Sequence, residues 1–172
     1  MISINHILWA DDKTSNKKDL AIHHFMQGEF LLNQGNYALA VLEFQDALDI
    51  DPNASTIHIS IADAYRRLGR SKHAENHLQI AIDLDPEELS SREMLGHLYL
   101  INRKYKEAEK EFLILSNLDS YNDNYLVTLA DLAKLQEKWG YSVDYYLKAF
   151  DLNPQNLKAL ENALQVCLGA EL

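Results

Sequence analysis

The sequence repeats one short segment three times, as DIDPN at residues 49–53, DLDPE at residues 83–87 and DLNPQ at residues 151–155. The prolines are separated by 86 − 52 = 34 and 154 − 86 = 68 residues, and the second spacing is twice the first. The missing member falls in NLDSY at residues 117–121, where Ser120 replaces the proline. A fixed period of about 20–50 residues is the signature of a repeat architecture.

Other positions recur with the same period. Some of these columns hold mainly small residues and others mainly large ones. Within one repeat the apolar residues recur at steps of three and four, as in Leu39, Leu42, Ala47 and Leu48, which predicts helices. Small residues are expected where two helices approach closely, and large ones beside them. The four repeating columns are Ala40, Ala74, Ala108, Ser142; Phe44, Leu78, Phe112, Tyr146; Gly28, Ala62, Gly96, Ala130; and Leu31, Tyr65, Tyr99, Ala133.

Two glycines and the repeated proline predict where each helix stops. Gly35 and Gly69 lie between consecutive helical segments, where a helix end favours a left-handed residue. The proline of each segment is expected in the first turn of the following helix, because that position has no intrahelical partner for an N–H group. Each repeat is therefore predicted to be a helical hairpin.

With its 34-residue period, small-residue columns and turn glycines, the sequence resembles the tetratricopeptide repeat family over about residues 21–170. The resemblance implies an all-α, right-handed superhelical solenoid of four helix-turn-helix units at 21–54, 55–88, 89–122 and 123–156, followed by a capping helix at 157–168. Leu157, Leu160, Leu164 and Cys167 form the stripe expected to cover the last open apolar face. Residues 1–20 are an N-terminal extension, and its apolar residues (Ile2 to Trp9) could be a helix, an extended cap or a tail.

The resemblance also implies a concave peptide-binding groove lined by the first helix of each unit. Some of these residues could instead pack only against the next helix. Family members that capture a chaperone's C-terminal carboxylate use a lysine and an asparagine where this sequence has Phe25 and Glu29, so that ligand is not expected. The predicted groove positions include Ile22, Phe25, Glu29, Leu32, Thr56, Ile59, Asp63, Arg66, Arg67, Glu93, His97, Leu100, Val127, Asp131 and Lys134.

Basic residues recur at the turn inside the hairpins, at Arg70, Lys104 and Lys138. Stacked units would bring them to one edge, where they could steer an acidic partner. The alternative is that they only stabilise helix ends and are compensated by Glu75, Glu107 and Glu109. The sequence leaves both interpretations open.

The composition is that of a globular protein, with 47% hydrophobic and 24% charged residues. A net charge of −10 disfavours a nucleic-acid partner, and no run approaches the length of a membrane helix. The single cysteine, Cys167, allows no internal disulfide, and the N-terminus does not resemble a secretory signal, so a cytoplasmic location is expected.

The sequence predicts no catalytic centre, metal site or cofactor. His73 and His77 are four residues apart, but no third ligand is evident, and no glycine-rich phosphate loop is present. We therefore expect a non-enzymatic adaptor or scaffold that binds a protein or peptide in the groove. The alternatives are a self-associating scaffold that forms a homo-oligomer, or a fragment of a longer repeat protein that resembles an assembly or secretion chaperone.

Overall fold

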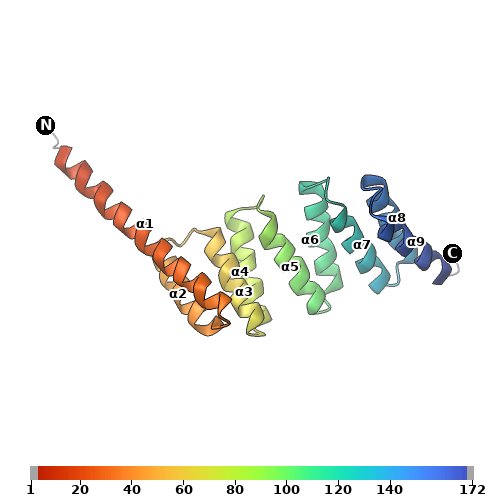
Figure 1. Cartoon of the computed structure of the whole chain (residues 1–172), viewed down its shortest axis with the longest axis horizontal. Helices are drawn as coiled ribbons and strands as arrows, with labels where there is room; N and C mark the ends of the chain where they lie inside the picture. Colours follow the sequence, from red (N-terminus) through yellow and green to blue (C-terminus); the bar gives the residue numbers. More distant parts are fainter. Residues whose placement is uncertain (1–3, 170–172) are drawn as a thin grey trace. The chain divides into compact units, whose positions relative to one another are not determined.

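The computed structural model describes the backbone of residues 4–169 and the side chains of residues 16–169. Over these residues the chain is all-α and contains no strand, as the sequence predicts (Figure 1). The helices are α1 (Ile4–Asn33), α2 (Tyr37–Ile50), α3 (Ser55–Arg67), α4 (Ser71–Leu84), α5 (Leu89–Ile101), α6 (Tyr105–Leu118), α7 (Asp123–Leu135), α8 (Trp139–Leu152) and α9 (Leu157–Gly169).

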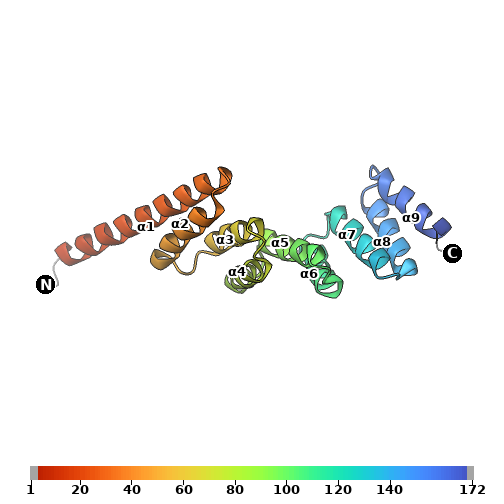
Figure 2. The same cartoon turned by 90° about the horizontal axis from the view of Figure 1, so that it is seen from below.

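The helix boundaries follow the repeat period. The first residues of α3, α5, α7 and α9 are 55, 89, 123 and 157, each 34 residues after the one before. Consecutive helices pack as the hairpins α1/α2, α3/α4, α5/α6 and α7/α8. Helix α1 differs because its 30 residues include most of the predicted extension, and Figure 2 shows it running well past its partner α2.

The chain divides into two compact units, Met1–Pro86 (the first unit) and Glu87–Leu172 (the second unit). In Met1–Pro86 one buried cluster joins α1, α2 and α3, and Phe44 and Ile61 are fully enclosed in it. Gly28 shows why the small residue is needed, because a Cβ atom there would lie 2.5 Å from the Phe44 ring. The predicted pairing of a small residue with a large one is therefore confirmed at this position.

The unit Glu87–Leu172 repeats this arrangement. A Cβ atom on Gly96 would lie 2.8 Å from the ring of Phe112, which is buried between α5, α6 and α7. At the C-terminal end of the described residues, α9 packs on α7 and α8 through the residues Ala159, Ala163 and Val166.

The stripe predicted for α9 is wrong. Leu157 and Leu164 are 61% and 57% exposed, and Leu160 and Cys167 are only half-buried. The buried side chains of α9 are small, and they allow the helix to approach α8 closely. Because the large apolar residues of α9 lie mainly on its exposed side, a prediction based on them selects the wrong face as the buried one.

Each hairpin turn contains one residue with positive φ. Gly35 and Gly69 have φ of 81° and 70°, which confirms the predicted left-handed turn. The equivalent positions in the next two hairpins are Arg103 and Glu137, with φ of 57° and 59°. The turn geometry is therefore kept where the glycine is not.

The prolines are not in the first turn of the following helix, so that prediction is wrong. Each proline lies in a loop, two residues after the last residue of a helix. Pro52 follows α2, Pro86 follows α4 and Pro154 follows α8. A proline just beyond a helix C-terminus prevents the helix from continuing.

Candidate functional site

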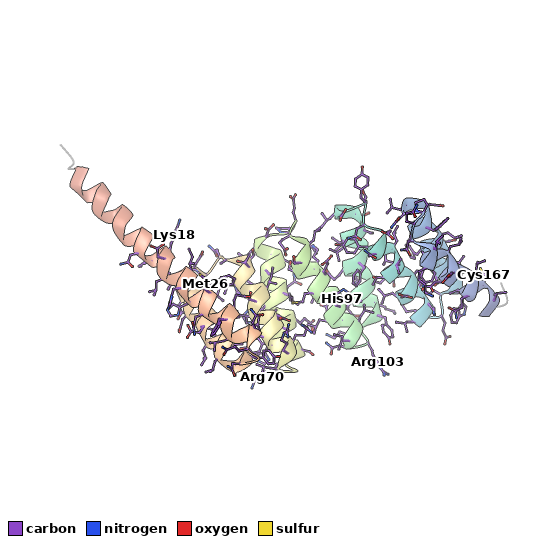
Figure 3. The ribbon with its side chains drawn as sticks, in the orientation of Figure 1. Lys18, Met26, Arg70, His97, Arg103 and Cys167 are labelled. Carbon is purple, nitrogen blue, oxygen red and sulfur yellow. The ribbon has the colours of Figure 1, made fainter. Side chains whose placement is uncertain are left out.

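A cleft of ≈ 480 Å³ lies in the first unit, between α1, the end of α2 and the start of α3. Ile22, Phe25 and Thr56, three of the predicted groove positions, line it. Lys17 and Lys18 also line it, and Figure 3 labels Lys18 on α1. The remaining lining residues are Ala21, Ile50, Asp51, Ala54 and Ile57.

The cleft has an apolar floor and a charged rim. Ile57 is buried, and the ring of Phe25 packs against that of Phe44 with centroids 5.8 Å apart. Lys17, Lys18 and Asp51 are exposed. Sequence reasoning missed the two lysines because it placed residues 1–20 outside the repeat region. Only the continuation of α1 through residue 20 brings them to this cleft.

The charged groove positions of the first unit, on α1 and α3, have hydrogen-bond partners. The Ser60 hydroxyl on α3 donates a hydrogen bond to Glu29 on α1 at 2.6 Å. Asp63 accepts hydrogen bonds from Arg66 and from Nε of Arg67, the latter at 2.8 Å. The hydrogen bond with Asp63 raises the pKa of Arg67. These side chains are therefore held in place before any ligand arrives.

In the second unit two acidic groove positions accept hydrogen bonds from tyrosine hydroxyls. Tyr125 donates to Glu93, and Tyr146 donates to Asp131. Burial, followed by the hydrogen bond to the carboxylate, raises the pKa of both tyrosines. The tyrosines therefore remain neutral donors, and they fix the two carboxylates.

The other predicted groove positions divide into exposed and packed side chains. His97, labelled on α5 in Figure 3, and Lys134 are exposed. The His97 ring meets that of Phe112 edge-on, with 5.2 Å between centroids. Leu32 is 8% exposed and belongs to the core, so its predicted groove role is wrong. The side chains that are half-buried are Ile59, Leu100 and Val127.

The basic turn positions differ in their surroundings. Arg70 is exposed in the turn before α4, and Lys104 lies over the Tyr99 ring at 5.2 Å. Nζ of Lys138 is 3.0 Å from a Glu109 carboxylate oxygen. Burial raises the pKa of Glu109, but hydrogen bonds with Gln136 and Lys138 outweigh it and leave the pKa lowered. The predicted compensation by Glu109 is therefore present at Lys138.

A cross-hairpin pair that sequence reasoning missed recurs at a separation of 19 residues. One member is on the first helix of a hairpin and the other is on the second helix. In the fourth hairpin the positions hold Leu126 and Tyr145, which pack on the apolar clusters. The polar pairs, with their closest distances, are His24–Glu43 at 2.8 Å, His58–His77 at 3.0 Å and Arg92–Glu111 at 3.3 Å.

Burial sets the protonation of the histidine pair. Desolvation lowers the pKa of His58, and it lowers the pKa of His77 to about 4 with a smaller contribution from His58. His73, which the sequence places four residues from His77, instead packs against Tyr65 with ring centroids 5.0 Å apart. The pair His58–His77 is therefore neutral at physiological pH.

Among the residues that the structure describes, no helix combines the length and apolarity needed to cross a membrane.

Comparison with known proteins connects this geometry to one family. The family model described as "Tetratricopeptide repeat" matches residues 17–55 and 59–118. The Caenorhabditis elegans protein O-mannosyl-transferase F38B6.6 is 37% identical over 91 residues. That match covers 53% of this chain and only 13% of the relative.

Solved structures share the fold at low sequence identity. MamA from Desulfovibrio magneticus RS-1 superposes with a TM-score of 0.77 at 16% identity, covering 89% of this chain and 86% of that chain. YrrB, described as a TPR protein with an unusual peptide-binding site, has a TM-score of 0.72 at 17% identity over 94% of this chain and 83% of its own. At these identities the likeness shows the fold alone.

Proposed function

The chain belongs to the tetratricopeptide repeat family, and we propose that it is an adaptor or scaffold that binds a protein or peptide through the first helices of its hairpins. The cleft of ≈ 480 Å³ carries this proposal, because positions expected to face a ligand, Ile22, Phe25 and Thr56, line it together. Apolar pockets that take an anchoring side chain, with polar groups at the rim, are typical of peptide-binding grooves. The division into repeat units at 21–54, 55–88, 89–122 and 123–156 is part of the same proposal.

The chemistry of the cleft defines the segment that it would take. Phe25 and Ile57 offer an apolar floor for one aliphatic or aromatic side chain of the partner. Lys17 and Lys18 at the rim favour a carboxylate close to that side chain. Among the basic turn residues, the exposed Arg70 would add to the attraction of an acidic partner.

Pre-positioned polar groups support binding along the rest of the first-helix faces. Glu29 and Asp63 in the first unit, like Glu93 and Asp131 in the second, already accept hydrogen bonds from neighbouring side chains. Side chains that are fixed before binding lose less conformational entropy when a ligand arrives. YrrB supports the proposal through its described peptide-binding site, although its ligand does not transfer at 17% identity.

We propose binding rather than catalysis as the work of this chain. The transferase name belongs to a relative of which the chain covers 13%, so it assigns no activity here. The expected partner is a protein or peptide, not a nucleic acid or a membrane.

A capture experiment with matched variants tests the proposal. Ile22→Asp introduces a charge into the cleft, and Leu42→Asp makes the same kind of change on α2 outside it. The side chains of Ile22 and Leu42 are each 55% exposed, so both variants are expected to fold. A partner from the native lysate should bind the original chain and Leu42→Asp but not Ile22→Asp. Equal capture by all three would refute the cleft as the site.

Self-association is a second candidate function, supported by the exposed apolar residues of the first hairpin. Met26 and Phe30 on α1, with Leu39 on α2, are each more than half exposed. Large apolar side chains exposed on one hairpin favour an interface between copies. Sedimentation of the purified chain should then show a dimer that Met26→Asp dissociates. A monomer at all concentrations would exclude this candidate.

A further inference from the structure

One histidine and two carboxylates gather on the first hairpin without a role in the proposed peptide site. His24 on α1 faces Glu43 and Asp46 on α2, and one ligand atom of each residue lies within 4.8 Å of the other two. We propose that His24, Glu43 and Asp46 form a binding site for a divalent transition-metal ion, with Zn²⁺ as the expected ligand.

The helical geometry brings the donors together. Glu43 and Asp46 are three residues apart on α2, a spacing that places both on one side of a helix. His24 lies opposite them on α1 because the hairpin pairs residues that are 19 positions apart. The three side chains therefore come from two rigid helices that are already packed together.

The distances are close to those that a metal ion requires. Nδ1 of His24 is 2.8 Å from Oε2 of Glu43 and 4.0 Å from Oδ2 of Asp46. Metal–ligand bonds of about 2.0–2.2 Å in tetrahedral geometry separate the donor atoms by about 3.4 Å. Side-chain rotations that change these two distances by about 0.6 Å each, and that bring the Glu43 and Asp46 oxygens, which lie within 4.8 Å of one another, to the same spacing, would satisfy this geometry.

The donor set selects the class of ion. Imidazole is a good ligand for zinc, copper, iron and nickel, whereas magnesium and calcium prefer oxygen donors alone. Two carboxylates and one histidine give three protein ligands, and the exposed side of Asp46 leaves room for water at a fourth position. The two negative charges also attract a cation before it is bound.

The other hairpins provide internal controls, because they have the same pair positions without a third donor. The residue equivalent to Asp46 is Ile80 beside His58–His77 and Ile114 beside Arg92–Glu111. In the fourth hairpin it is Lys148. Within the side chains that the structure describes, this grouping of three donors therefore belongs to the first hairpin.

Metal binding would link α1 to α2. The ion would replace the direct hydrogen bond between His24 and Glu43 with bonds to both side chains and to Asp46. A ligand that binds only the folded hairpin stabilises it by mass action. The first hairpin would thus unfold at a higher temperature when zinc is present.

Titration with zinc chloride, followed by calorimetry, tests the proposal on the full chain. A Cys167→Ser background removes the free thiol as a competing ligand. We expect one ion per chain, a rise in the unfolding temperature with zinc, and weaker binding in His24→Gln and Asp46→Asn. Each of these variants should lose about tenfold or more in affinity, because even outer-shell changes around a metal cost about 10–100-fold.

His97→Gln is the matched control, since it removes an exposed histidine from the second unit. It should bind zinc with unchanged affinity. The proposal is overturned if the chain binds no zinc at millimolar concentration. It is also overturned if His24→Gln and Asp46→Asn bind as tightly as the control. Asp46→Asn keeps the test valid if His24→Gln unfolds, because Asp46 is exposed. None of these results depends on the peptide partner.

Discussion

The two halves of the chain use the same frame with different polar chemistry. In Met1–Pro86 the cross-hairpin pairs are His24–Glu43 and His58–His77, and the turn residues are glycines. In Glu87–Leu172 the third hairpin, α5/α6, has the ion pair Arg92–Glu111, and the fourth, α7/α8, has Leu126 and Tyr145. The turn residues with positive φ are Arg103 and Glu137. Helix lengths from α3 onward are nevertheless 13 or 14 residues throughout.

This difference shows which positions determine the fold. The small and large residues that let two helices approach, such as Gly96 against Phe112, are tied to the backbone spacing and cannot change independently. The cross-hairpin pair needs only to fill a half-buried site with satisfied groups. It can therefore carry a histidine, an ion pair or apolar residues, and so it can acquire a function of its own.

The largest effect is expected from breaking the ion pair of the third hairpin. Arg92 and Glu111 are 14% and 16% exposed, so Glu111→Ala leaves a charge largely buried. It should lower the free energy of unfolding in urea by about 3 kcal/mol. The double variant Arg92→Leu with Glu111→Tyr, which copies the fourth hairpin, should remain within about 1 kcal/mol of the original chain. A single variant that costs nothing would contradict this account.

The close approach of the first hairpin should be the next most sensitive feature. Gly28→Ala places a methyl group 2.5 Å from the Phe44 ring and should destabilise the chain by about 2 kcal/mol. Gly140→Ala on α8 is the control, because a Cβ atom there meets nothing within 4 Å. Equal thermal stability for the two variants would show that packing against Phe44 does not limit the size of the residue at position 28.

Acid should destabilise the first unit through its histidine pair. The pKa of His77 is lowered from 6.5 to about 4 by burial, so the unfolded chain binds more protons between these values. The stability of the folded chain is therefore unaffected by the protonation of His77 above pH 6.5, and it decreases as the pH falls from 6.5 toward about 4. Allowing for partial exposure, the loss is about 1–2 kcal/mol.

Urea unfolding of the original chain and of His77→Phe at several pH values measures this loss. The variant should have a smaller loss of stability between pH 6.5 and 4.5. Glu88 and Glu109 do not interfere, because their pKa values are lowered and their contribution is lost only below the ordinary value of 4.5. An unchanged slope in the variant would rule out the histidine pair as the cause.

The turn residues should give the smallest effect and should show opposite signs in the two units. Gly69→Ala places a side chain at φ of 70° in open space, so only backbone strain remains, at about 1 kcal/mol. Arg103→Gly should relieve the same strain at φ of 57° and raise stability by about 0.5–1 kcal/mol. Differential scanning calorimetry can compare them, and two shifts of the same sign would disprove the explanation.

The sequence predicts those parts of the fold that depend on residues close together in the chain. The period, the hairpins and the turn glycines follow from spacing and from backbone preferences. The direction of an apolar face does not, because periodicity cannot show which side of a helix has a neighbour. Leu42, counted in the helical pattern, is 55% exposed, and the buried side of α9 is lined by alanines and a valine.

The candidate sites are predicted only in part for the same reason. Ile22, Phe25 and Thr56 follow from the family positions and do line one cleft. Lys17 enters it only because α1 continues through the predicted extension. His24 and Glu43 are 19 residues apart, and only the packed hairpin reveals that they meet.

Site-specific photo-crosslinking tests the central proposal, which is that a partner binds in the cleft of the first unit. A photoreactive phenylalanine analogue at Thr56 would face the cleft, and the same group at Asn76 on α4 would be exposed away from the cleft lining. Irradiation in the native lysate should link a partner to the Thr56 variant and not to the Asn76 variant. Crosslinks from Asn76 alone would contradict binding in the cleft and would place the partner on the second helices.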